Sequence, residues 1–122
     1  VINNTTLNLF HDVYFSPLHV DKLSLIVGRI IKDPIYGLYH CVSSDSISKY
    51  DFGVQMAKVF RLSVSNINRV SVESMNFQAE RPKNMALDSG KLADKFKCSI
   101  PSALDSIKLM KRQYDKNNNL LN

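Results

Sequence analysis

One stretch of sequence organises this chain, Glu80-Arg81-Pro82-Lys83-Asn84-Met85-Ala86-Leu87-Asp88-Ser89-Gly90-Lys91-Leu92. Pro82 biases Arg81 towards an extended backbone, so the arginine side chain leaves from a strand-like or loop conformation. A guanidinium held there presents several N–H donors in one plane, which suits a doubly charged oxyanion. Asp88 is a good N-cap and predicts a short helix after it. Alternatively, Arg81 pairs with a carboxylate and the turn is only a connector.

Strands and helices are predicted to alternate on both sides of this stretch, which makes the fold class α/β. The other predicted elements are a strand ending near Phe10, a helix from Ser16-Pro17 to about Lys32, a strand over Leu38–Val42, a helix from Ser48 to about Leu62, a short strand around Ile67 to Val72, and a helix from Ser102 to Tyr114. Ser48 and Asp51 have the spacing of a capping box. Residues 115–122 lack helical period and caps, so we expect a frayed tail after a domain at 1–114.

The segment Leu38–Val42 is a nearly continuous apolar run, which is typical of a strand covered on both faces in a parallel sheet. Such a strand leaves backbone groups unpaired when its neighbours are absent. We therefore expect it to pair with another part of a longer protein or with a second copy of the chain, as a possible homo-oligomer.

Composition predicts one domain, because 122 residues with 44% hydrophobic content can bury a core but fit two domains poorly. Cys41 and Cys98 lack companions at metal-ligand spacing, so we expect free thiols and no metal site. The chain begins at Val1 without an initiator methionine, a signal peptide or an apolar stretch that could span a membrane. The expected location is cytoplasmic, with no membrane partner.

The net charge of +5 raises the possibility of a nucleic-acid surface, since lysines and arginines gather in the last quarter of the chain. These residues lack interleaved aromatics, and no helix-turn-helix, RNP-like or GXXG motif accompanies them. A solvated helix face is the favoured interpretation, and no nucleic-acid partner is expected. A nucleic-acid binder would instead lose affinity steeply with added salt.

A family resemblance rests on motifs spread over roughly residues 7 to 112. The motifs are Arg81-Pro82-x-Asn84-x-x-Leu87-Asp88-x-x-Lys91-Leu92, then Phe96 and Ile100-Pro101-x-x-Leu104, and upstream Gly37-Leu38-Tyr39-His40, Ser48 with Phe52, and Asp12 with Ser16-Pro17. In this order they resemble the carboxy-terminal part of the dTDP-4-dehydrorhamnose reductase family, which belongs to the extended short-chain dehydrogenases.

The resemblance implies that this chain is a substrate-binding portion whose Rossmann half lies before Val1. The chain contains neither a glycine-rich dinucleotide fingerprint nor Tyr-x-x-x-Lys, so no catalytic residue is predicted in it. By resemblance the cofactor of the intact protein is NAD(P)H, and none is expected to bind this chain alone. In that family the strand at Leu38–Val42 joins the sheet of the cofactor domain.

Two functions follow from the resemblance. The first is the nucleotide-sugar-binding portion of an NAD(P)-dependent reductase of dTDP-4-keto-deoxysugars, with Arg81 for the diphosphate, Tyr14 and Phe15 for a ring, and Ser16 and Asn84 for hydroxyls. The alternative is a non-catalytic binding or regulatory module of the same fold, like the regulatory subunit of methionine adenosyltransferase. A Tyr-x-x-x-Lys motif in the remaining half would distinguish the enzyme from the module.

Overall fold

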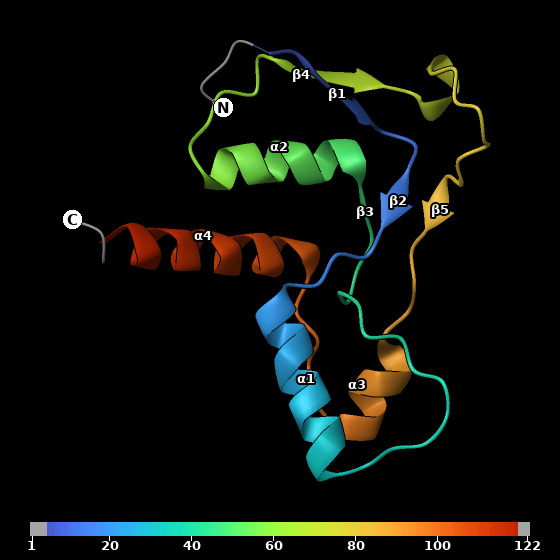
Figure 1. Cartoon of the computed structure of the whole chain (residues 1–122), viewed down its shortest axis with the longest axis vertical. Coiled ribbons are helices and arrows are strands. Elements are labelled where there is room, and N and C mark those ends of the chain that lie inside the picture. Colours follow the sequence, from blue (N-terminus) through green and yellow to red (C-terminus); the bar gives the residue numbers. More distant parts are fainter. Residues whose placement is uncertain (1–4, 120–122) are drawn as a thin grey trace.

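The computed structural model describes residues 5–119 and has the α/β fold that the sequence predicts (Figure 1). In chain order its elements are β1 (Leu7–Phe10), β2 (Tyr14–Phe15), α1 (Val20–Lys32), β3 (Ile47–Ser48), α2 (Lys49–Val59), β4 (Ile67–Val70), the 3-10 turn η1 (Val72–Ser74), β5 (Asn84–Met85), α3 (Gly90–Phe96) and α4 (Ala103–Asn119). The predicted strand that ends near Phe10 is confirmed as β1. The strand predicted around Ile67 to Val72 is found as β4, but it ends at Val70, and Val72 begins η1.

The strands form two small sheets. β1 pairs with β4 in parallel, and β2 lies in the middle of a three-stranded sheet between β3 and β5. β2 runs antiparallel to β3 and parallel to β5, with Tyr14 beside Ser48 and Asn84 and with Phe15 beside Ile47 and Met85. The second sheet thereby joins three distant parts of the chain.

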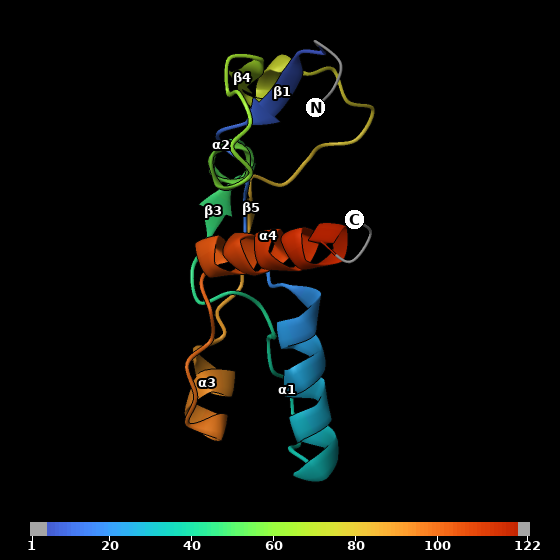
Figure 2. The same cartoon turned by 90° about the vertical axis from the view of Figure 1, so that its left-hand side faces the viewer.

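Helix α2 lies between the β1–β4 pair and helix α4, as two perpendicular views show (Figures 1 and 2). Gly53 allows the close approach of β1, because a Cβ atom there would stand 2.2 Å from Leu9 Cδ1. On the other side of α2, the rings of Phe60 and Tyr114 pack edge to face with their centroids 5.7 Å apart. Ile107 of α4 is fully buried.

Helices α1 and α3 build a second apolar cluster away from the sheets. Leu92, Phe96 and Ile100 are buried there, and Ile26 and Ile30 of α1 pack against them. The cluster also has a cation over an aromatic ring, because the Arg29 guanidinium lies 4.5 Å from the Phe96 ring centroid. Burial of these side chains holds α3, and with it the end of the 80–92 stretch, against α1.

The sequence predicts a capping box of Ser48 and Asp51 in the first turn of α2, and the two residues do bond there, although the Asp51 carboxylate accepts from the Ser48 hydroxyl and not from the Ser48 backbone amide. The Ser48 hydroxyl accepts a hydrogen bond from the Asp51 amide at 3.0 Å and donates to Asp51 Oδ2 at 2.6 Å. Ser48 is also 1% exposed and lies in β3, so one residue both ends a strand and caps a helix.

Replacing Ser48 by alanine is expected to destabilise the protein by about 1 kcal/mol, because the Asp51 amide loses its acceptor at the helix start. Chemical denaturation of the intact protein measures this loss. Ser63→Ala is the matched control, since Ser63 bonds only exposed side-chain and backbone groups in a loop. Equal stability of the two variants would contradict the capping role.

The strand predicted at Leu38–Val42 is wrong for this structure, in which the segment has no regular secondary structure. A strand needs a neighbour for its backbone ladder, and within residues 5–119 no other strand runs beside this segment. Instead, Tyr39 and Cys41 pack against the α1–α3 cluster, and the Leu38 carbonyl accepts a hydrogen bond from Lys91 Nζ at 2.9 Å.

Two helix starts differ from the prediction. Helix α1 begins at Val20 rather than at Ser16-Pro17, because Phe15 is still in β2 and His19 Nδ1 accepts from the Asp21 amide. Helix α3 has Ser89 as its N-cap, while Asp88 accepts from the Gly90 amide at 2.6 Å in the turn before it.

Two helix ends also differ. Helix α2 ends at Val59, before the predicted end near Leu62. The chain turns away just after the helix, at Arg61, which has a φ of 57°. Residues 115–119, predicted to be a frayed tail, continue α4 to Asn119, and an interaction between Lys111 and Asp115 at helical spacing supports them. The remaining tail positions, 120–122, and positions 1–4 lie outside the described residues.

Candidate functional site

Two adjoining hollows lie beside the loop that connects β4 to β5. Their volumes are about 310 and 300 Å³, and Val72, Phe77, Arg81 and Pro82 line both of them. We call the two hollows together the Arg81 cleft. The first is lined by residues 72–83 alone, and the second extends from them to Phe10, Val13, Lys49 and Met85. The cleft therefore joins the loop to both sheets and to the start of α2.

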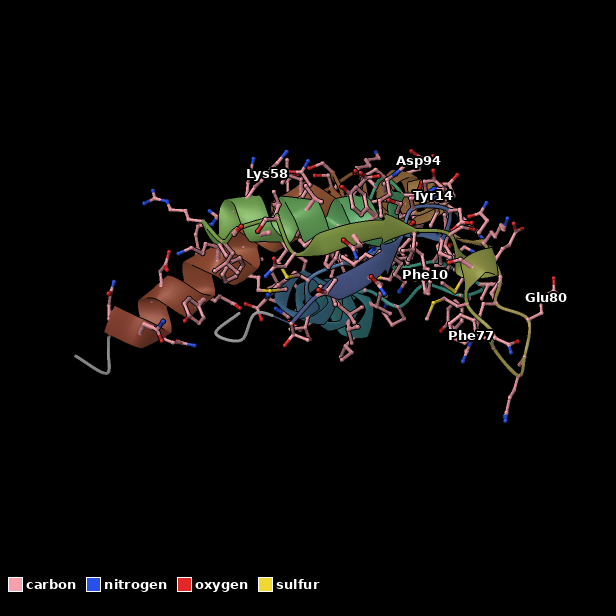
Figure 3. All side chains as sticks on the ribbon, turned by 90° about the horizontal axis from the view of Figure 1, so that it is seen from above. Phe10, Tyr14, Lys58, Phe77, Glu80 and Asp94 are labelled. Atoms are coloured by element: carbon pink, nitrogen blue, oxygen red, sulfur yellow. The ribbon has the colours of Figure 1, made fainter. Side chains whose placement is uncertain are left out.

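Arg81 is exposed and faces an aromatic ring rather than an acid. Its guanidinium carbon lies 5.1 Å from the Phe77 ring centroid, and Phe77 packs edge to face on Phe10 with 6.0 Å between centroids. Phe10 and Phe77 lie at the same end of the molecule, with Glu80 on the loop beyond them (Figure 3). No ion pair joins Arg81 to a carboxylate of residues 5–119. The alternative in which Arg81 merely pairs with an acid is not what this structure contains.

The base of the loop is fixed by Asp12. Asp12 Oδ2 accepts from the Ser71 hydroxyl at 2.6 Å, and Oδ1 accepts from the Val72 amide at 2.9 Å. Lys83, at the other end of the loop, lies 3.7 Å from Asp12 and pairs closely with Glu73. These contacts hold both ends of the loop that carries Phe77 and Arg81.

Acid is expected to break the Asp12 contacts only at a pH well below the ordinary titration range of aspartate. The bonds from Ser71 and Val72 lower the pKa of Asp12 from 3.8 to about 2. Because the folded pKa is depressed, the stabilisation is fully present above about pH 4 and is lost as the pH falls through 2. Amide exchange at Val72, followed from pH 6 to pH 2, measures the release.

Asp12→Asn is the control for this titration, because it keeps an acceptor oxygen and removes the titrating charge. Exchange at Val72 in that variant is expected to lose its dependence on the carboxyl titration. A wild-type loop that opens near pH 4 would contradict the depressed pKa.

The predicted site residues of β2 and β5 divide between two faces of their sheet. Tyr14 and Asn84 are register partners, and Phe15 and Met85 are the next pair. Side chains alternate along a strand, so Tyr14 and Asn84 share one face, while Phe15 and Met85 share the other. Met85 lines the Arg81 cleft, which places the cleft on the Phe15 face.

Each of these predicted residues also has a local contact. Phe15 packs edge to face on Phe52, with centroids 5.3 Å apart. Asn84 Oδ1 accepts from the Ala86 amide at 3.0 Å. The Tyr14 backbone amide donates to the Lys83 carbonyl at 2.8 Å, while Tyr14 as a whole is 44% exposed. Ser16 is nearly buried, and its hydroxyl is shared with the backbone of Leu87, accepting from the amide at 3.4 Å and donating to the carbonyl at 3.3 Å. Ser16 thus ties the end of β2 to the 80–92 stretch.

Lys49 and Phe77 also line the cleft, although neither was predicted from the sequence as a site residue. Lys49 is the first residue of α2, and its Nζ lies 4.2 Å from the Phe15 ring centroid. The Ser48 capping box was a usable signal for Lys49, because the residue after an N-cap occupies a fixed place in the first turn. No local pattern marks Phe77, which reaches the cleft through its contact with Phe10.

Two other expectations concern thiols and metals. Cys41 and Cys98 are free, as predicted, and burial raises the pKa of the Cys41 thiol. Among residues 5–119 there is no group of three or more potential metal ligands, and no helix combines the length and apolar character needed to cross a membrane.

The fold is that of known reductases. The dTDP-4-dehydrorhamnose reductase of Bacillus anthracis, solved in complex with NADP, superposes with a TM-score of 0.76 at 24% identity, over 85% of this chain and 37% of that chain. The corresponding reductase of Clostridium acetobutylicum gives 0.74 at 24% identity, over 84% and 36%. The predicted fold, a substrate-binding part of this class, is confirmed.

The family model for the RmlD substrate binding domain matches residues 1–115. The chain therefore belongs to the RmlD substrate binding domain family. A curated relative is methionine adenosyltransferase 2 subunit beta of Xenopus laevis, 32% identical over 95 residues that make up 74% of this chain and 28% of that protein. The chain thus spans less than a third of the length of this relative.

Proposed function

We propose that this chain is the nucleotide-sugar-binding portion of an NAD(P)-dependent reductase that acts on dTDP-4-keto-deoxysugars. One observation carries the proposal, namely that Arg81 lies at a cleft in an RmlD substrate binding domain without a carboxylate partner among residues 5–119. A planar guanidinium can donate two parallel hydrogen bonds to a phosphate, and such charge-assisted bonds are about twice as strong as neutral ones.

In this proposal Arg81 contacts the diphosphate, and the other predicted residues contact or position the sugar. β5 is an edge strand of its sheet, so a ligand that crosses this edge can reach both faces. Phe15 lies on the face of the sheet that borders the cleft. Tyr14 and Asn84 present an aromatic ring and an amide on the opposite face. Ser16 acts mainly through its bonds to Leu87, which fix the chain just after β5.

The remaining partners belong to the intact protein. This chain covers 37% of the solved reductase from Bacillus anthracis, so most of that protein has no counterpart here. That reductase was solved in complex with NADP, and we propose the same kind of cofactor for the whole protein. We place that cofactor on a Rossmann domain outside this chain and expect the intact protein to be cytoplasmic. We also propose that this chain associates with that domain or with a second copy of itself.

A second candidate function is a non-catalytic binding or regulatory module. It is favoured by the 32% identity to the frog methionine adenosyltransferase subunit, which is higher than the 24% identity to the superposed reductases. The two candidates differ in chemistry outside this chain. An intact protein with Tyr-x-x-x-Lys that oxidises NADPH when given a dTDP-4-keto-deoxysugar is the reductase, and one that binds without turnover is the module.

Calorimetry tests the division of labour between the two halves. The isolated chain is expected to show no tight binding of NADPH, because it lacks the glycine-rich loop that cradles a dinucleotide phosphate. The intact protein is expected to bind both NADPH and a dTDP-sugar. A low-micromolar dissociation constant for NADPH on the isolated chain would contradict this assignment.

A further inference from the structure

Two cations of the Arg81 cleft lie over aromatic rings instead of beside acids. Lys49 Nζ is 4.2 Å from the Phe15 centroid, and the Arg81 guanidinium is 5.1 Å from the Phe77 centroid. Neither makes an ion pair with a carboxylate of the described residues. Lys83 differs from both, because Glu73 and Asp12 neutralise it.

The hollow between these two cations has no acid in its lining. Lys49 and Arg81 are its charged residues, and the rest of its wall is apolar, including Val13 and Met85. An aromatic ring attracts a cation only weakly at an exposed site, whereas an anionic oxygen forms a charge-assisted hydrogen bond with it. An anion that enters the hollow can therefore draw both cations from their rings.

Lys49 and Arg81 approach the hollow from separate elements. Lys49 begins α2, whose first turn is fixed by the bonds between Ser48 and Asp51. Arg81 comes from the loop before β5, which Asp12 and Lys83 hold at its two ends. These contacts set both positions, and none of them uses the Lys49 ammonium or the Arg81 guanidinium.

We propose that Lys49 is a second phosphate-binding residue, which acts with Arg81 as a two-cation clamp on the diphosphate of the ligand. The inference rests on the proposed function and adds to it the partner charge that Arg81 alone does not supply. A diphosphate ester fits this arrangement, because its two phosphates meet two cations while its organic part contacts the apolar wall. Lys83, which Glu73 and Asp12 neutralise, holds the loop and is not one of the two phosphate-binding cations.

The test compares Lys49→Gln with Lys58→Gln in the intact protein, because Lys58 lies on the same helix, is exposed and does not line the Arg81 cleft. Calorimetry would use three probes: dTDP, inorganic pyrophosphate and thymidine, which lacks phosphate. Lys49→Gln is expected to weaken dTDP and pyrophosphate about tenfold or more and to leave thymidine unchanged. Lys58→Gln is expected to change these affinities by less than about twofold, since it removes the same charge from the same helix at a position outside the cleft. Lys49→Arg is expected to restore most of the phosphate affinity.

Each other outcome has a defined meaning. If Arg81→Gln weakens a dTDP-sugar and Lys49→Gln does not, the clamp is overturned while the proposed function stands. If dTDP and pyrophosphate depend on Lys49 but no dTDP-sugar binds, the clamp stands and the proposed function fails. If Lys49→Gln lowers the melting temperature and Lys49→Arg restores only stability, Lys49 is structural and the clamp is overturned. Failure of all phosphate probes to bind the wild type overturns both.

Discussion

Replacing Arg81 by lysine is expected to weaken nucleotide-sugar binding by the intact protein about tenfold to a hundredfold, with NAD(P)H affinity unchanged. Lysine keeps the charge but loses the planar set of donors, and a hydrogen bond to a charged group is worth roughly 1.5–3 kcal/mol. The Arg81 guanidinium has no acid partner within residues 5–119, so the change removes no ion pair of the fold described here. Calorimetric titration with a dTDP-sugar and with NADPH measures both affinities.

Arg81→Ala provides the comparison, because it removes charge and geometry together and should weaken binding further. The structural alternative is that Arg81 holds the loop through the Phe77 ring, 5.1 Å away. Under that alternative, both variants lower the melting temperature and leave nucleotide-sugar affinity untouched. Such a result would assign Arg81 to the loop and remove it from the binding site.

Leu92→Ala is expected to destabilise the protein by about 2–5 kcal/mol, the largest effect on stability that we predict. Leu92 is 0% exposed and belongs to the buried cluster that joins α3 to α1. Truncation removes buried methyl groups and leaves a cavity among Phe96, Ile100 and the side chains of α1. Denaturant unfolding of the intact protein, analysed for the domain transition, gives the loss directly.

Leu87→Ala is the matched control, since it is the same substitution five positions earlier in the same stretch. Leu87 is 48% exposed, so its truncation should cost much less than that of Leu92. Similar losses for the two leucines would show that the α1–α3 cluster is not the core of this part of the domain.

The sequence predicted those features that a few neighbouring residues determine. The Ser48–Asp51 capping box is one, because hydroxyl, carboxylate and amide are brought together by a single helical turn. The loop conformation at Arg81 is another, because proline disfavours a helix at the residue before it, and residues 81–82 have no regular secondary structure. The family motifs added the fold, which the superposed reductases confirm.

The composition of the cleft could not be predicted from local patterns. Phe10 of β1, Lys49 of α2 and the loop that carries both Phe77 and Arg81 are three separate segments, and only tertiary packing brings them together. β2 and β5 have two residues each, too few for a period-two pattern to be recognised. The strand predicted at Leu38–Val42 was wrong for a related reason. A strand forms only where a neighbouring strand supplies its hydrogen-bond partners, and the sequence of one segment does not show whether such a neighbour exists.

The sheets of this domain also constrain the order in which it can fold. Asn8 of β1 bonds to Asn68 of β4, 60 positions later, and Ser16 bonds to Leu87, 71 positions later. During synthesis the first two strands therefore leave the ribosome long before their partners exist. The backbone hydrogen bonds of helices such as α1 and α2 are local, so these helices can form in that interval, whereas closing so long a loop slows strand pairing. The Arg81 cleft, which needs both sheets, is consequently among the last parts of the domain to be assembled.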